Sequence, residues 1–187
     1  MEYEYFQVTL GRERAAQKAL ADHLHGRAET RAVFAPLLGF ASDQALVLMA
    51  AGGDLAGAPG VVASEHHRLT PTLRPTDDRP PMAGGIYVHN WFTIDGEAAD
   101  EFVRLSGEAW PDFERRFETK IHGLFLAAES AEDRSAGARR LLLMTRYRDL
   151  GEWQVSRDPT SDAMQVFLRR RELTRASLAR ACVLMPR

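Results

Sequence analysis

The feature that most constrains the fold of this chain is an internal repeat. Residues 46–55 align with residues 141–150 without a gap, and five of the ten aligned positions are identical. Because short matches arise by chance, the pattern around them has to agree as well. Each copy follows a strand-like, a helical and a second strand-like segment, and precedes an apolar strand ending in a proline, Pro75 or Pro186. The sequence therefore predicts a tandem duplication.

The expected boundary between the two copies is the segment 76–85, Thr-Asp-Asp-Arg-Pro-Pro-Met-Ala-Gly-Gly. Adjacent prolines and aspartates disfavour both a helix and a central strand, which is typical of a semi-stiff linker. We expect an N-terminal half over residues 1–75 and a C-terminal half over residues 86–187. Each half has the order β-α-β-β-(α)-β, which is the ferredoxin-like order.

The spacing of apolar residues predicts the individual elements. The strands are expected at residues 3–10, 31–41, 44–51 and 66–74 of the first half and at residues 86–94, 120–128, 139–147 and 176–185 of the second. The helices are expected at residues 16–26, 98–117 with a restart or kink at Pro111, 149–157 and 161–172. Glycine and proline within residues 56–64 leave the first half with a degenerate second helix, and residues 129–137 are expected to form a polar loop.

This order predicts an α+β fold in which two ferredoxin-like βαββαβ modules are fused in one chain. An antiparallel sheet with helices on one face needs cover on the other, and two such sheets can cover each other as an α/β barrel. Side chains alternate between the two faces of a strand. The less apolar set is expected to face the space between the sheets, and comprises Tyr3, Tyr5, Gln7 and Thr9 on the first strand and Tyr87, His89, Trp91 and Thr93 on the fifth.

Aromatic walls combined with a few polar groups are typical of small-molecule sites. The candidate ligand-binding residues are therefore Tyr5, Gln7, Tyr87, His89 and Trp91. His89 is the candidate general base, because a neutral imidazole can accept a proton near neutral pH. The alternative is a solid interior in which the tyrosine and tryptophan side chains only pack and His89 is a hydrogen-bonded core residue.

The composition excludes several classes of function. With 45% hydrophobic residues, 27% charged residues and a net charge of −2, the chain is typical of a globular protein, and nothing indicates a nucleic-acid or membrane partner. No apolar run reaches the roughly 18 residues of a membrane span. The single cysteine, Cys182, cannot form an intramolecular disulfide, which is usual in the cytoplasm, where we expect the protein. The charged run 169–172 is interpreted as a solvated helix face.

Motifs for common chemistries are absent as well. The sequence has no Walker loop, no Gly-x-Ser-x-Gly elbow and no His or Cys pairs with zinc-ligand spacing. We therefore expect no metal and no cofactor.

Several segments of the second half resemble the NIPSNAP family. They are residues 85–93 (Gly-Ile-Tyr-Val-His-Asn-Trp-Phe-Thr), Glu101-Phe102, residues 110–113 (Trp-Pro-Asp-Phe), residues 121–125 (Ile-His-Gly-Leu-Phe), residues 143–150 with Trp153, and residues 167–169 (Phe-Leu-Arg). The resemblance covers residues 85–186 and implies the dimeric α/β-barrel superfamily. That superfamily includes antibiotic-biosynthesis-type monooxygenases, EthD-like proteins and haem-binding chlorite dismutases and dye peroxidases. Members commonly carry an arginine in the first strand, where this chain has Asn90, so the role of that arginine cannot be transferred.

Four functional hypotheses remain open at this stage. The first is a NIPSNAP-like barrel that binds a small hydrophobic or aromatic molecule between its sheets. The second is a cofactor-independent monooxygenase or isomerase with His89 as base and Tyr5, Tyr87 and Trp91 shaping its pocket. The third, haem binding through a histidine, is permitted by the superfamily. The fourth is a non-catalytic structural or partner-binding module, and exposed strand edges would in any case allow a homodimer.

Overall fold

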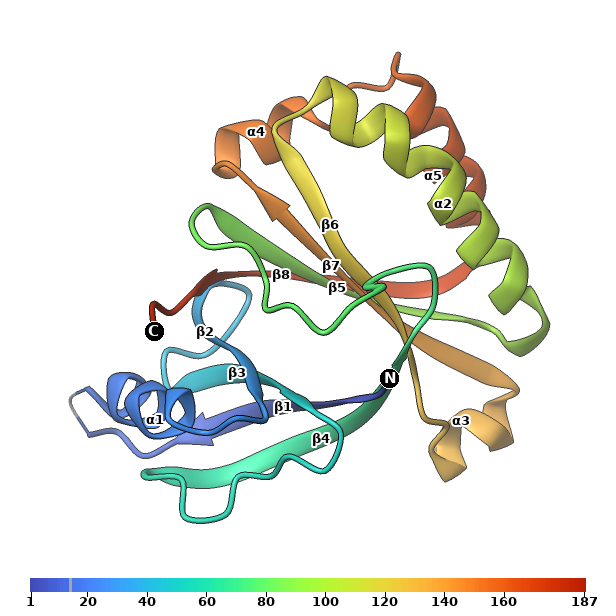
Figure 1. Ribbon diagram of the computed structural model, residues 1–187. Helices are drawn as coiled ribbons and strands as arrows, with labels where there is room; N and C mark the ends of the chain where they lie inside the picture. Colours follow the sequence, from blue (N-terminus) through green and yellow to red (C-terminus); the bar gives the residue numbers. More distant parts are fainter. Residues whose placement is uncertain (14) are drawn as a thin grey trace.

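In the computed structural model, which describes residues 1–13 and 15–187, antiparallel strands close into a single barrel (Figure 1). The strands are β1 (Tyr3–Leu10), β2 (Thr30–Leu38), β3 (Gln44–Ala50), β4 (Val61–Pro71), β5 (Ile86–Asp95), β6 (Thr119–Ala127), β7 (Ala138–Tyr147) and β8 (Thr174–Leu184). The helices are α1 (Ala16–His25), α2 (Ala99–Arg116), α3 (Ala131–Ala136), α4 (Leu150–Val155) and α5 (Asp162–Glu172), with a short 3₁₀ turn η1 (Gly96–Ala98) before α2.

The order of strands around the barrel is β1-β3-β2-β8-β5-β7-β6-β4. Within each half the local order is therefore fourth, first, third, second, as the ferredoxin-like module requires. The two halves join where the last strand of each pairs with the second strand of the other. Phe34 of β2 lies opposite Leu184 of β8, and Leu69 of β4 lies opposite Ala127 of β6. The predicted fold class, two ferredoxin-like modules whose sheets face each other as an α/β barrel, is confirmed.

The helices cover the outer faces of the barrel (Figure 1). Helix α1 packs on the N-terminal sheet, where Leu20 and Leu24 are buried against Val8 and Val33. Helices α2 and α5 lie together on the C-terminal sheet, in a second core that includes Phe102, Phe113 and Val166. A third core fills the barrel itself. Three layers of apolar packing thus follow from the alternation of side chains along the strands.

The alternation of β1 and β5 is the one expected from the sequence. Tyr3, Tyr5 and Tyr87 belong to the core inside the barrel, with Trp91 packed against it. The other face of each strand contributes to the two helix-facing cores, for example through Val8 and Phe92.

Two helices differ from the expectation. Helix α2 continues through Pro111 without a restart, because Trp110 and Phe113 on either side of the proline are both buried against the sheet. The segment 129–137 contains helix α3 (Ala131–Ala136), where a polar loop was expected. Ser130 and Asp133 form a reciprocal capping box at its start, and Gly137 ends it in the left-handed conformation with φ 57°. The sequence contained this capping signal.

The boundaries of two strands differ as well. Strand β4 runs over Val61–Pro71 and not 66–74, because it pairs with β1 as far as Val61 opposite Leu10. Strand β2 ends at Leu38. Between β3 and β4 no helix occurs among the described residues, and between β4 and β5 no regular element occurs in the described chain. The division into residues 1–75, 76–85 and 86–187 stays a prediction. None of the described helices is long and apolar enough to cross a membrane.

Candidate functional site

Three of the five predicted site residues contact one another inside the barrel. The hydroxyl of Tyr5 lies 3.0 Å from Nδ1 of His89, and their ring centroids are 5.8 Å apart. The ring of Trp91 meets Tyr5 edge-on at 5.9 Å. Strands β1 and β5 thus bring Tyr5, His89 and Trp91 together across the space between the two sheets.

The other two predicted residues lie at the periphery of this group. Gln7 accepts a hydrogen bond on Oε1 from Arg180 of β8. The hydroxyl of Tyr87 donates to the backbone carbonyl of Met82 at 2.6 Å, in the segment between β4 and β5.

His89 is neutral over the physiological range of pH. Burial lowers its pKa to about 3, with a smaller contribution from His122. Its Nε2 atom is buried and has no hydrogen-bond partner within the described chain. An imidazole with so low a pKa accepts a proton poorly, since a general base works best when its pKa is near the operating pH.

The sequence interpretation missed two side chains next to this group. His67 of β4 lies 4.7 Å from the ring of Trp91, and burial lowers its pKa. Arg180 carries its guanidinium 5.1 Å from the ring of Phe40. His67 lies inside the expected strand 66–74, but strand pairing was not predicted for β4 or β8. Only the barrel register brings His67 and Arg180 next to β1.

The space between the sheets is densely packed around His89. Its exposed fraction is 1%, and those of Phe34, Leu48 and Met144 are 0%. His89 lines none of the cavities described below. The five predicted residues therefore stay a candidate site whose room for a ligand depends on movement of packed side chains.

A second location offers both room and unsatisfied polar groups. A cavity of about 330 Å³, the helix–sheet cavity, lies between the outer face of the C-terminal sheet and helices α2 and α5. Its volume is within the range of small-molecule sites. Its walls combine apolar and polar side chains in similar measure. They include Val88, Asn90 and Phe92 of β5, Leu143, Thr145 and Tyr147 of β7, Phe113 of α2, Met164, Phe167, Arg170 and Arg171 of α5, and Arg157, Thr174 and Ser177.

Arg170 is the most unusual group of the helix–sheet cavity. Its side chain is only 7% exposed, and its Nη1 donates to Oγ of Ser106 at 3.0 Å. The guanidinium lies 4.7 to 5.0 Å from the rings of Phe92, Phe102 and Phe167. Among the ion pairs of the described residues none involves Arg170. Burial lowers its pKa to about 10, so the side chain remains a cation at neutral pH.

Asn90 supplies a complementary acceptor in the same cavity. Its Oδ1 atom is buried without a hydrogen-bond partner in the described part of the protein. Tyr147 adds a buried hydroxyl whose pKa is raised by desolvation. A buried cation, a free amide oxygen and a neutral phenol therefore border one space, which the arginines Arg157 and Arg171 also line.

The sequence interpretation of residues 169–172 was wrong at one position. Arg169 and Arg171 are exposed as expected, whereas Arg170 is buried. The signal was available, because Arg170 continues the buried stripe of α5 from Ala163 and Val166 at helical spacing.

A larger hollow of about 720 Å³ beside the start of α1 is lined in part by Arg12, Glu13 and Lys18. Of the buried polar atoms without a partner in the described chain, none belongs to its lining. We assign no site there.

Comparison with known proteins identifies similar structures but no similar sequence family. No family model and no curated protein matches the sequence. Among solved structures, an anthrone oxidase-like protein superposes with a TM-score of 0.68 at 10% identity, over 99% of this chain and 92% of the other. A monooxygenase-like protein from Listeria innocua gives 0.52 at 12% identity, over 100% and 95%. A haem-degrading enzyme from Listeria monocytogenes gives 0.53 at 10% identity, over 96% and 98%. At such identities the similarity shows the fold, a ferredoxin-like α/β barrel.

Proposed function

We propose that this protein binds a small planar aromatic or hydrophobic molecule that carries a hydrogen-bonding oxygen, and that the molecule binds in the helix–sheet cavity. The observation that carries the proposal is that Arg170 and Asn90 line the same cavity. Within the cavity of about 330 Å³, Oδ1 of Asn90 has no hydrogen-bond partner among the described residues, and the buried Arg170 takes part in none of their ion pairs.

A buried cation without an anion is expensive, because several kcal/mol of hydration are lost and little is regained. Stacking on aromatic rings compensates in part, at about 2 kcal/mol for a desolvated contact. A ligand oxygen that accepts from Arg170 would supply the missing interaction, and a ligand hydroxyl would donate to Oδ1 of Asn90. The rings of Phe92, Phe113 and Phe167 would enclose the flat body of the ligand.

The names of the similar structures agree with such a ligand. One is an anthrone oxidase-like protein and one degrades haem, so both names refer to planar polycyclic compounds. The resemblance of residues 85–186 to the NIPSNAP family supports a NIPSNAP-like branch of this fold, which we also retain as a proposal.

Binding of a planar probe tests the proposal. We expect 1,8-dihydroxyanthraquinone to bind the wild-type protein in a fluorescence or calorimetric titration. Asn90→Leu and Arg170→Met are each expected to weaken binding about tenfold or more, as for a lost hydrogen bond to a charged or buried group. Arg169→Met is the matched control, because it removes the neighbouring arginine of α5 from an exposed position, and it should leave affinity unchanged. Equal affinity in all four proteins would exclude this cavity.

A second candidate function is cofactor-independent oxidation with His89 as the base. It is supported by the buried contact of Tyr5 with Nδ1 of His89 and by the free Nε2 on the other side of the ring. Because the low pKa makes His89 a weak base, this reaction requires a substrate whose C–H proton is unusually acidic. The test reaction is the oxidation of an anthrone by O₂, in which a CH₂ group becomes a carbonyl and one oxygen atom leaves as water. If His89 is the base, His89→Asn should abolish turnover and Asn90→Leu should not. The reverse pattern would place the chemistry in the helix–sheet cavity.

A further inference from the structure

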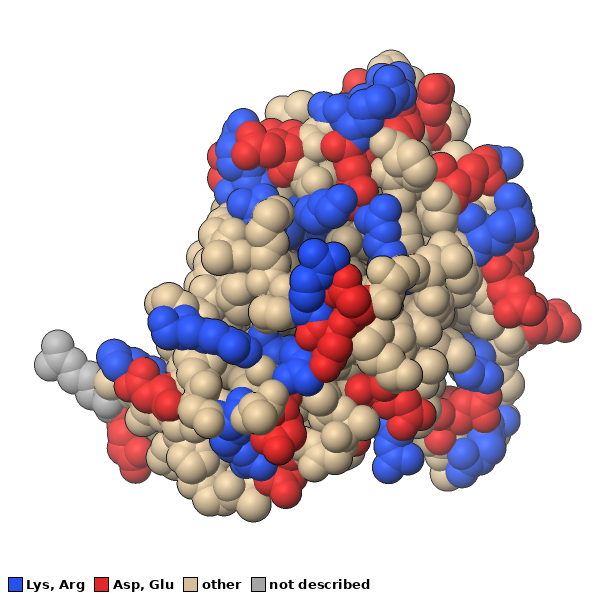
Figure 2. Space-filling model, in the orientation of Figure 1, with Lys and Arg blue, Asp and Glu red and all other residues tan. Residues whose placement is uncertain are grey.

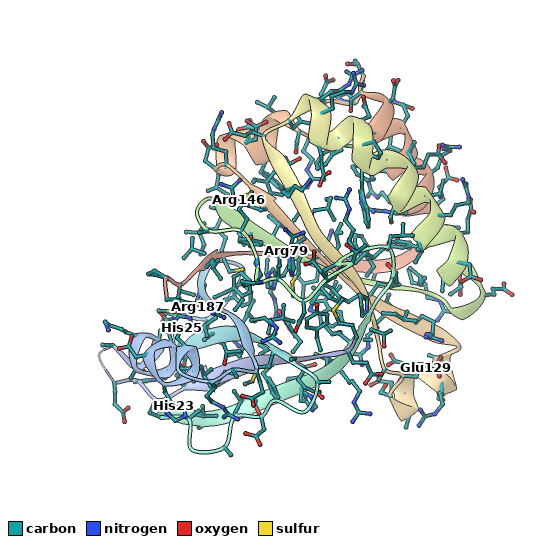
Figure 3. The ribbon with its side chains drawn as sticks, in the orientation of Figure 1. His23, His25, Arg79, Glu129, Arg146 and Arg187 are labelled. Atoms are coloured by element: carbon teal, nitrogen blue, oxygen red, sulfur yellow. The ribbon has the colours of Figure 1, made fainter. Side chains whose placement is uncertain are left out.

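The segment between β4 and β5 covers a second polar hollow at one end of the barrel. This linker pocket, of about 510 Å³, lies between that segment and the ends of β6 and β7. Four cationic side chains line it, namely Arg74, Arg79, Lys120 and Arg146. Figure 2 shows blue side chains in the middle of the face that the segment crosses, and Figure 3 shows Arg79 and Arg146 on that face.

Two carboxylates neutralise only some of these cations. Glu114 accepts from Arg74 at 2.7 Å and lies 3.2 Å from Nζ of Lys120. Asp77 accepts from Arg79 at 2.6 Å. Arg146 takes part in none of the ion pairs of the described residues. The pocket therefore keeps an excess of positive charge, and Arg146 is its cation without a carboxylate.

Two glycines hold Arg146 in place. Its Nε donates to the carbonyl of Gly84 at 2.8 Å. Gly84 and Gly85 both have positive φ angles, and a Cβ on Gly85 would lie 2.2 Å from the carbonyl oxygen of Tyr147 and 3.2 Å from the guanidinium carbon of Arg146. Only glycine lets the backbone pass this close to the guanidinium. The Nη groups of Arg146 are thus left for another acceptor.

His122 contributes a second unsatisfied group to the linker pocket. Its Nε2 atom is buried and has no hydrogen-bond partner within the described residues. The neutral imidazole can donate a hydrogen bond from that atom in one of its tautomers. Tyr87, whose hydroxyl is held by Met82, forms the wall between this pocket and the barrel interior.

From this arrangement we infer that the linker pocket binds a small organic oxyanion, a carboxylate or phosphate ester with an apolar body. Arg146 holds the oxyanion through its Nη groups, with His122 and Lys120 beside it. The apolar body rests on Pro75, Pro80 and Met82, which line the same pocket. Arginine favours such groups because its planar guanidinium donates two parallel hydrogen bonds.

The test uses phenyl phosphate and phenylacetate as probes, in calorimetric titrations of the whole protein at low salt. We expect at least one probe to bind, with weaker binding at high ionic strength. Arg146→Gln should weaken binding about tenfold or more, and His122→Phe should weaken it as well. Inorganic phosphate and acetate, run in parallel, should bind less tightly than the matching phenyl compounds, because they lack the apolar body.

Arg134→Gln is the matched control. Like Arg146, Arg134 donates to a backbone carbonyl, that of Glu129, and takes part in none of the described ion pairs, but it lies on α3 away from the linker pocket. Its removal should leave affinity unchanged. Circular dichroism melts establish that each variant is folded. The inference is overturned if neither probe binds, or if Arg146→Gln and Arg134→Gln bind the probe equally. Asn90→Leu changes the helix–sheet cavity and not the linker pocket. If this variant still binds the phenyl probes, the two sites are distinct.

Discussion

At the scale of single residues, the groups that matter most are polar side chains that lack a hydrogen-bond partner or a counter-charge in the interior. Arg170 and His89 are buried and His122 is half-buried, and each has a pKa lowered chiefly by desolvation. A protein built only for stability would replace such groups by apolar ones of the same size. Their presence is the strongest physical argument for binding sites in this barrel.

Arg170 allows stability and binding to be separated. Methionine has a similar length and no charge, so Arg170→Met is expected to leave thermal stability unchanged or to raise it, while the affinity for the planar probe falls. Differential scanning calorimetry of the ligand-free protein checks the first part. A drop in stability of more than about 3 kcal/mol would instead identify Arg170 as a structural group, since that is the cost of breaking a needed buried interaction.

His89 gives the protein a predictable response to acid. Its pKa in the folded state is about 3, below the ordinary value of 6.5 that the unfolded chain has. Below pH 6.5 the unfolded state therefore binds a proton that the folded state does not, and stability falls as the pH decreases toward 3. The slope from one such group approaches about 1.4 kcal/mol per pH unit.

Urea unfolding at pH 7, 5 and 4 measures this slope. His89→Asn, whose side-chain amide can still form a hydrogen bond with Tyr5, should flatten the dependence on pH. His23→Asn, on the exposed face of α1, should not. An identical slope in wild-type protein and His89→Asn would show that other groups control the acid sensitivity.

At the scale of elements, helix α2 shows how packing outweighs local preference. Pro111 lies within the helix and cannot donate a backbone hydrogen bond there. The helix continues because Phe102, Leu105, Trp110 and Phe113 are buried on one side of it. Burial of each such side chain stabilises by about 1.5 to 3 kcal/mol, which together exceeds the cost of one proline.

Replacement of this proline should therefore stabilise the protein. Pro111→Ala restores the missing donor and removes the steric conflict, and we expect a gain of about 1 to 3 kcal/mol in the free energy of unfolding. Chemical denaturation measures this gain.

Asp112→Ala is a useful contrast, because Asp112 accepts a hydrogen bond from the backbone of Ala163 at the start of α5. That change should destabilise the contact between the two helices.

At the scale of the whole molecule, the two halves complete each other. Strand β8 pairs with β2 and β4 pairs with β6, so both edge strands of each half pair with an edge strand of the other half. The inner faces of both sheets are covered only when they meet. Tyr3 of the first half, for example, packs edge-on against Phe125 of the second at 5.5 Å.

Separation of the halves should expose these faces. We expect residues 1–75 and 86–187, produced as separate chains, to be unstable or aggregated alone and to form a folded complex when mixed, because each exposes one apolar sheet face. Analytical ultracentrifugation and near-ultraviolet circular dichroism distinguish these states. Independent folding of both pieces as monomers would contradict this expectation and show that the inner faces need no cover.

The sequence alone determined the general plan of the protein. The repeat of residues 46–55 at 141–150 and the alternation along β1 and β5 are local patterns. They were sufficient to predict the fused α/β barrel and the inner faces of these two strands. Residues 129–137 show that even local signals can be overlooked, since the capping box of α3 is visible in the sequence.

Only the tertiary structure decided where the polar groups without a hydrogen-bond partner or a counter-charge lie. Arg170 looked like part of a solvated run, and Asn90 like a departure from a family pattern, until α5 was packed on β5. Arg146 and His122 come together with Arg79 only because the segment after β4 crosses the ends of β6 and β7. The physical reason is that burial and hydrogen-bond satisfaction depend on neighbours distant in the chain, whereas periodicity depends on neighbours nearby.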